Sequence, residues 1–426
     1  MKPLWPDEVE SRIRAEARSL DEQQTPLEIR FCRRCVVSNQ RPRIVFDEEG
    51  VCSACRYAER KNLPPAYDAD GLVHGSVRSA GGIDWPMREA ALIDLLKRHK
   101  RKAGYDVVAP CSGGKDSATV AHKLKHTYGM RPLCVKWAPF LYTDIGRKNL
   151  DSFIHSGFDV MVMHPNGIIH RKLARLSFEY LGDPFQPFVF GQLAYPMHMA
   201  LRFNVPLVFY GENGEAEYGG DPSANDKPCW DRDDWERVYL KGAGVEKLIK
   251  IGLELGAISP QEADEASEFY SLPPLNEMEA QGVQFHWLGH YLKWHPQANY
   301  YYATEHTGFE CNTERSEGTY SKYASLDDKM DGIHYYMAYV KFGIGRATSD
   351  AAHEVRDGEI TREEAVALVD RYDGEVPSKH MTECQEYMGV DNNHFWKVAR
   401  RFHKPHVWLH QNGSWEPRKT VAGERS

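Results

Sequence analysis

A glycine- and serine-rich segment lies between an apolar run and a helix-like stretch, and this order constrains the fold more than any other feature of the chain. The segment is Ser112-Gly113-Gly114-Lys115-Asp116-Ser117. It follows the apolar run Tyr105 to Ala109 and precedes the helix-like stretch Ala118 to His126. Glycines let the backbone approach a ligand closely, and the start of the following helix directs N–H groups at an anion. The pattern predicts a strand, a phosphate-binding loop and a helix in succession.

Three further apolar runs lack clean alternation of polar and apolar residues, as is typical of parallel strands buried on both faces. They are Pro132 to Trp137, Val160 to His164 and Leu207 to Tyr210. Helical stretches separate the runs, at 116–128, 146–156, 168–179 and 190–203. This order predicts an α/β fold with a doubly wound parallel sheet, whose ligands bind beyond the carboxyl ends of the strands.

Four of the nine cysteines form a C-x2-C-x16-C-x2-C pattern: Cys32, Cys35, Cys52 and Cys55. This spacing is typical of two knuckles around one tetrahedral zinc ion, as in zinc ribbons. Four thiolates leave no open position for substrate, so the pattern predicts a structural Zn²⁺ that stabilises a segment too small to bury its own core.

Polar residues follow two of the predicted strands. Glu212, Asn213 and Glu217 come after the fourth strand and are predicted catalytic residues, because acids beside a phosphate site hold Mg²⁺ or orient a substrate amine or hydroxyl. The alternative is a solvated acidic loop. Lys136 and Trp137 at the end of the second strand, with Gly211 after the fourth, are candidates for holding the nucleotide.

Composition limits the partners. The chain has 426 residues and a formal net charge of −8, and its N-terminal residues carry charges where a signal peptide needs an apolar core. We expect a cytoplasmic protein without a membrane-spanning segment, and the acidic balance disfavours nucleic acid as a ligand.

The loop Ser112 to Ser117 has neither the Walker A nor the dinucleotide-binding spacing. It resembles the PP-loop of the N-type ATP pyrophosphatases. With the zinc knuckles and further blocks downstream, the chain resembles the N-acetyl sugar amidotransferases of bacterial O-antigen and flagellar-glycan pathways over about residues 31–377. The blocks include Trp287 to His290, Lys293 to Gln297, Ser316 to Tyr323 and Asp327 to Lys329.

This resemblance implies an ATP-dependent reaction in which an acetamido oxygen of a sugar, expected to be a nucleotide-activated sugar, is adenylated and then replaced by ammonia. The products are an acetamidino sugar, AMP and pyrophosphate. The loop would hold the phosphates, Lys115 would offset developing charge and Asp116 would help to hold Mg²⁺. Glu212, Asn213 and Glu217 would orient the sugar amide or ammonia.

Substrate-binding candidates lie downstream, where polar and cationic side chains suit a nucleotide sugar: Arg315, Glu317, Thr319, Tyr320, Lys322 and Lys341. A fused glutaminase would need a cysteine at the N-terminus or on a nucleophile elbow, and no cysteine of the chain has either context. We therefore expect a separate glutaminase partner. The resemblance implies one similar to the glutaminase and cyclase subunits of histidine biosynthesis.

The expected organisation is a helical segment (1–30), a zinc ribbon (31–62), a linker and helix (63–103), the PP-loop domain with a substrate-binding insertion (104–345) and a C-terminal helical region with a polar tail (346–426). Two other functions stay open. A PP-loop enzyme that thiolates tRNA would need a sulfur-handling cysteine pair and an RNA-binding surface, and a nucleotide-sensing scaffold would bind a protein partner through its ribbon.

Overall fold

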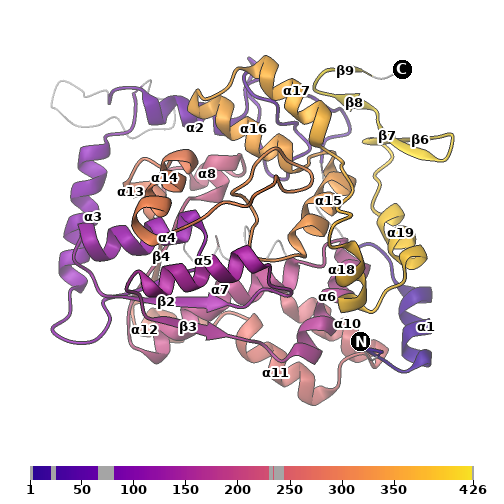
Figure 1. The fold of residues 1–426 in the computed structure, drawn as a ribbon, viewed down its shortest axis with the longest axis horizontal. Helices are drawn as coiled ribbons and strands as arrows, with labels where there is room; N and C mark the ends of the chain where they lie inside the picture. Colours follow the sequence, from indigo (N-terminus) through magenta and orange to yellow (C-terminus); the bar gives the residue numbers. More distant parts are fainter. Residues whose placement is uncertain (1–2, 21–24, 66–80, 230–233, 235–243, 425–426) are drawn as a thin grey trace.

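The computed structural model describes residues 3–20, 25–65, 81–229, 234 and 244–424. Its centre is a five-stranded parallel sheet with the strand order β3-β2-β1-β4-β5 (Figure 1). The four predicted strands are present, and a fifth, which the sequence analysis did not indicate, completes the sheet. The strands are β1 (Val107–Pro110), β2 (Pro132–Trp137), β3 (Val160–Met163), β4 (Leu207–Tyr210) and β5 (Gln284–Trp287).

Both faces of the sheet are buried, which explains why the strands lack alternation in the sequence. Val108 and Val208 point into one hydrophobic cluster, whereas their neighbours Val107 and Leu207 point into another. Successive side chains of a strand face opposite sides, so a strand covered on both faces is apolar throughout.

Helices cover each face. The first cluster takes side chains from α6 (Gly167–Leu181), α7 (Gln186–Arg202), α10 (Val245–Leu255) and α11 (Pro260–Tyr270). The second takes them from α3 (Trp85–His99), α4 (Lys115–His122), α5 (Asp144–His155) and α14 (Pro296–Thr307). This arrangement is a doubly wound α/β fold. The remaining elements of this part are η1 (Lys123–Thr127), α8 (Gly214–Tyr218), η2 (Pro222–Ala224), α12 (Leu275–Ala280) and α13 (Leu288–Tyr291).

The cysteine segment shares a core with the C-terminal part of the chain. Helix α2 (Ser53–Asn62) starts directly after Cys52, contains Cys55 and lies beside α16 (Arg346–Asp357) and α17 (Arg362–Tyr372) at the top of Figure 1. Cys32 and Cys55 belong to the same hydrophobic cluster as Ala351 and Ala365. A segment of this size gains most of its apolar burial from such a neighbour, so the expected ribbon and C-terminal region fold against each other.

The N-terminal helix lies against a helix from the C-terminal part of the chain. Helix α1 (Asp7–Glu16) is held to α19 (Asn392–Arg401) through Arg14, whose guanidinium donates to Asp391 at 3.1 Å (Figure 1). Between α17 and α19 lies α18 (Met381–Met388), and α15 (Asp331–Phe342) precedes α16. The polar tail pairs in two hairpins: β6 (Trp408–Gln411) with β7 (Ser414–Pro417), and β8 (Lys419–Thr420) with β9 (Gly423–Glu424).

The described helices include none that combines the length and the apolar character needed to cross a membrane.

Candidate functional site

The candidate site lies where the strand order reverses, between β1 and β4. The chain leaves β1 towards β2 on one side and leaves β4 towards β5 on the other, so the loops after the two strands diverge and leave a crevice. A cavity of about 590 Å³ occupies this position. Ser112 and Asp116 line it from the β1 side, and Gly211 and Glu212 line it from the β4 side.

The loop after β1 is held in one shape by its own serines. The backbone N–H of Ser112 donates to Ser117 Oγ at 3.1 Å, and that of Gly114 donates to Ser112 Oγ at 3.1 Å. Gly113 has φ +84°, and a Cβ there would lie 2.8 Å from the backbone of Leu150. Only glycine meets both requirements. The predicted phosphate-binding residues therefore form a compact turn that ends at the start of α4.

Lys115 and Asp116 form an ion pair at the first turn of α4. Asp116 lines the cavity, and its Oδ1 accepts a hydrogen bond from Asn299 Nδ2 of α14 at 3.1 Å. Lys115 is 9% exposed, and its Nζ lies 5.7 Å from the ring centre of Tyr323. Asp116 thus faces the cavity with a fixed orientation, whereas Lys115 is largely covered by other residues.

Lys136 and Trp137, the candidates on β2 for holding the nucleotide, mainly contact other residues of the protein. Lys136 Nζ donates to the carbonyl of Ser112 at 2.8 Å and to Asp327 Oδ2 at 3.1 Å. The buried lysine therefore stabilises the position of the loop. Trp137 lines one wall of the cavity, but its ring is 3% exposed and packs edge to face on Tyr270. Trp137 is chiefly a core residue.

The loop after β4 brings a carboxylate to the cavity. Gly211 is required there because a Cβ would lie 2.7 Å from the ring of Trp294. Burial, followed by the nearby carboxylate of Asp116, raises the pKa of Glu212 to about 7. Asn213 points away: its Oδ1 caps α8 by accepting from Glu215 N, and its Nδ2 donates to Ala224 O at 2.8 Å. Of the two, Glu212 alone lines the cavity.

Glu217 lies outside the cavity in a buried ionic network. Its Oε2 accepts from Lys61 Nζ at 2.9 Å, and His353 Nε2 lies 3.3 Å away. Burial opposes ionisation, yet Lys61 and His353 together hold the pKa of Glu217 below its ordinary value. The network joins α2, α8 and α16, which is a structural position rather than one that faces a ligand.

Most of the substrate-binding candidates are engaged in protein contacts. Arg315 pairs with Glu375 at 2.6 Å, and Glu317 accepts from the backbone N–H of Ser378 at 3.0 Å. The remaining contacts are Thr319 Oγ1 to Asp350 at 2.7 Å, Tyr320 OH to Glu354 at 2.7 Å, Lys322 Nζ to Thr313 O at 3.1 Å and Lys341 Nζ to Leu181 O at 2.9 Å. None of the six lines the cavity at the switch point, and Lys341 alone lines a second cavity that adjoins it.

Several cavity residues had no role in the sequence analysis: Arg41, Arg43, Asp327, Asp331 and Tyr335. The two arginines come from the cysteine segment, and the other three come from the start of α15 and the loop before it. Asp327 belongs to one of the blocks that carry the family resemblance, but no local pattern places any of the five at a cavity, because two distant segments must fold over the carboxyl edge of the sheet to bring them there.

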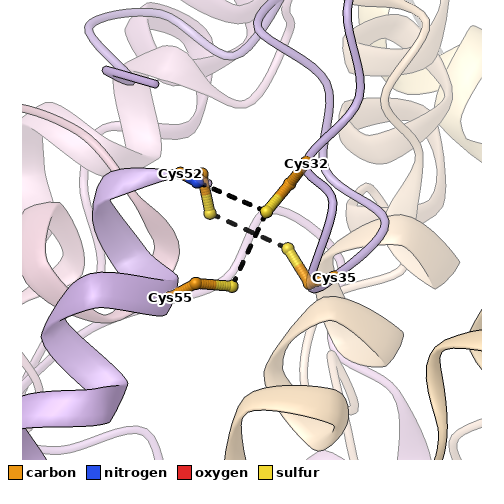
Figure 2. A group of neighbouring side chains, drawn as sticks. All are labelled: Cys32, Cys35, Cys52 and Cys55. Carbon is orange, nitrogen blue, oxygen red and sulfur yellow. Dashed lines mark hydrogen bonds between the residues drawn. The ribbon is translucent and has the colours of Figure 1, made fainter. Parts of the chain in front are cut away.

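The four cysteines of the predicted zinc site lie together (Figure 2). Their sulfur atoms lie within 4.8 Å of one another, and all four side chains are buried. Cys32 Sγ lies 3.8 Å from Cys55 Sγ, and Cys35 Sγ lies 3.8 Å from Cys52 Sγ. A tetrahedral zinc ion with Zn–S bonds of about 2.3 Å requires sulfur separations of about 3.8 Å, so the cluster fits that ion.

Among the described residues, this is the only group of three or more metal-binding side chains with convergent ligand atoms. His286, which the sequence places four residues before His290, hydrogen-bonds to Tyr291 and Gln284 instead. The acids of the cavity do not converge either, so an Mg²⁺ ion there would take part of its ligands from water and substrate phosphates.

These features define an α/β protein whose cavity at the sheet's switch point is lined by a glycine-containing loop and carboxylates, with a four-cysteine cluster that could hold zinc. Residues 317–421 match the family model described as LPS biosynthesis protein WbpG-like, C-terminal domain. The match covers 105 of the 426 residues and shows that this C-terminal region is similar to that of a family of LPS biosynthesis proteins. No curated protein matches the chain. The matched segment begins in the loop before α15 and supplies Asp327, Asp331 and Tyr335 to the cavity.

Proposed function

We propose that the protein is an AMP-forming amidotransferase that converts an acetamido group of a nucleotide-activated sugar to an acetamidino group. The observation that carries the proposal is the cavity at the switch point, where the loop Ser112 to Ser117 faces the carboxylate of Glu212. The WbpG-like match over one wall of this cavity supports a substrate of the lipopolysaccharide pathway.

The reaction has two steps. The acetamido oxygen attacks the α-phosphorus of ATP, the bond between the α-phosphorus and the bridging oxygen breaks, and pyrophosphate leaves. Ammonia then attacks the former amide carbon, and the C–O bond breaks with release of AMP that carries the acetamido oxygen. Adenylation is needed because an amide oxygen is a poor leaving group at neutral pH.

The residues of the cavity suit these steps. The turn from Ser112 to Ser117 and the start of α4 would receive the phosphates, since backbone N–H groups there favour an anion. Asp116 would help to hold Mg²⁺, which offsets phosphate charge when it is bound. Glu212, with a pKa of about 7, is suited to take the proton that ammonia loses on attack. We assign no ligand contact to Asn213 or Glu217.

An isotope experiment tests the reaction directly. The chain is incubated with ATP, Mg²⁺, ammonia and candidate acetamido nucleotide sugars whose acetamido oxygen is ¹⁸O. We expect AMP and pyrophosphate in equal amounts, an amidino sugar, and the label in AMP. ADP and phosphate as products, or AMP free of label, would contradict the proposal.

One observation bears on tRNA thiolation, the other enzymatic function. Cys111 lines the cavity directly beside the loop. A thiolation enzyme that used Cys111 to carry sulfur would be inactivated in the Cys111→Ser variant, whereas an amidotransferase would retain ammonia-dependent AMP formation. Mass spectrometry of tRNA incubated with the protein provides the second readout.

A further inference from the structure

A second cavity of about 560 Å³ adjoins the first. Asp116, Glu212, Arg41 and Tyr335 line both cavities, so the two meet beside the carboxylates of the candidate site. The far walls of the second cavity come from the junction of α6 and α7, from α15 and from the start of α16. Its volume suits a small molecule the size of an activated sugar.

Most charged groups of this second cavity have partners within the protein. Arg346 pairs with Asp350 at 3.0 Å, and His334 Nδ1 lies 2.9 Å from Asp183. Arg43 donates two hydrogen bonds to Glu215, at 3.0 Å and 2.6 Å. Because these cationic groups already contact acidic partners, they bind an incoming anion more weakly than an unpaired cation would.

Arg41 is different. Its Nε donates to the carbonyl of Gly219 at 2.7 Å, and its guanidinium lies 5.7 Å from the ring centre of Tyr218. Within the described residues no carboxylate lies within salt-bridge distance of it, because Glu215, the nearest acid along the loop, is taken by Arg43. Arg41 is half-buried, and it lines both cavities where they meet.

We propose that the second cavity holds the acceptor substrate and that Arg41 binds an oxyanion of it, a phosphate or a sugar carboxylate. The inference rests on the proposed function for its assignment of ATP to the first cavity. A half-buried arginine without an acid partner gains most from a planar or tetrahedral oxyanion, which accepts two of its N–H groups at once. The acceptor's amide would then lie at the junction, beside Asp116 and Glu212.

This geometry gives the cysteine segment a role in specificity. Arg41 lies six residues after Cys35, and the bond from its Nε to Gly219 fixes the segment over the loop after β4. The segment that could hold zinc therefore also supplies Arg41, which binds the acceptor in this proposal.

Equilibrium binding tests the proposal without turnover, so it remains informative if the proposed reaction is wrong. Isothermal titration calorimetry on the full chain uses three probes: α,β-methylene-ATP for the first cavity, UDP as a phosphate source and glucuronate as a carboxylate source. The variants are Arg41→Gln, Arg41→Lys, which keeps the charge but loses the planar fork, and the exposed Arg30→Gln as a control on the same segment.

We expect Arg41→Gln to weaken UDP or glucuronate binding about tenfold or more, with Arg41→Lys intermediate and α,β-methylene-ATP unchanged. Loss confined to UDP identifies a phosphate as the oxyanion, and loss confined to glucuronate identifies a carboxylate. Loss of α,β-methylene-ATP affinity alone, or unchanged affinity for all three probes, would overturn the proposal. Unfolding temperature and zinc content show whether a variant is folded. If Arg41→Gln does not fold, the binding affinities of Arg41→Lys test the proposal instead.

Discussion

Lys61 and Glu217 form a buried ion pair, with 2.9 Å between Nζ and Oε2 and side chains that are 1% and 4% exposed. Lys61 Nζ also donates to the carbonyl of Trp294 at 2.9 Å. The pair connects α2, which contains Cys55, to α8, the helix after β4. It thereby fixes the position of the loop that carries Glu212.

We expect Lys61→Met to destabilise the protein by about 3–5 kcal/mol, because removal of one partner leaves a buried charge with reduced compensation. Urea unfolding measures the loss. The exposed pair of Arg98 and Asp94 on α3 provides the control, and Arg98→Ala should cost less than about 1 kcal/mol.

Glu217→Gln separates a structural from a catalytic role. A structural role predicts lower stability with AMP formation retained by the folded fraction. Full stability combined with loss of turnover would instead restore Glu217 to the catalytic centre.

Zinc is expected at about one equivalent per chain. Cys32→Ser should lose the metal and lower the unfolding temperature, because the thiolates and the core shared with α16 and α17 are fixed by the same ion. Elemental analysis and thermal unfolding measure both effects. Cys384→Ser is the matched control, since Cys384 is buried on α18 far from the cluster in sequence. Undiminished zinc in Cys32→Ser would refute the assignment.

The loop after β1 should matter for rate and not for folding. Lys115→Ala and Asp116→Ala are each expected to lower the rate of AMP formation about 10²–10³-fold, the usual loss for one preorganised electrostatic contact. Circular dichroism checks the fold, and Lys102→Ala, an exposed lysine on the preceding loop, is the control. Wild-type rates in both loop variants would remove the loop from the reaction.

Glu212 should make stability depend on pH. Its folded pKa of about 7 lies above the ordinary value, so the protonated form is favoured in the folded state. The stabilisation is complete below the unfolded pKa, about 4.3, and is lost as the pH rises towards about 7. Glu212→Gln should therefore melt above the wild type at pH 8, with a smaller difference at pH 5. Asp328 and Glu354, whose pKa values burial also raises to about 7, titrate equally in both proteins and cancel in the comparison. An equal difference at both pH values would contradict the assigned pKa.

The source of ammonia is the last prediction. We expect the isolated chain to use ammonium salts and not glutamine, and to gain glutamine use when a glutaminase partner is added. Release of glutamate from glutamine by the chain alone would show that no partner is needed.

The strands and their loops could be predicted because local patterns define them. The apolar runs before Cys111 and Gly211 are strands, and the capping box of Thr361 and Glu364 begins α17 as its sequence indicates. By contrast, Thr382 and Gln385 have the same spacing but cap no helix, since α18 begins at Met381 after His380. The strand β5 was missed because Gln284–Trp287 mixes polar and aromatic residues and is defined as a strand by its pairing with β4.

The sequence alone determined the four-cysteine cluster, the loop at Ser112 to Ser117 and the parallel order of strand and helix, because each depends on residues close together in the chain. Only the tertiary structure decided which polar residues face the cavity. It turned Asn213 into a helix cap, buried Glu217 against Lys61 and brought Arg41 from the cysteine segment to the edge of the sheet. Side-chain direction at a loop depends on contacts between distant segments, and those contacts are fixed only when the whole chain has packed.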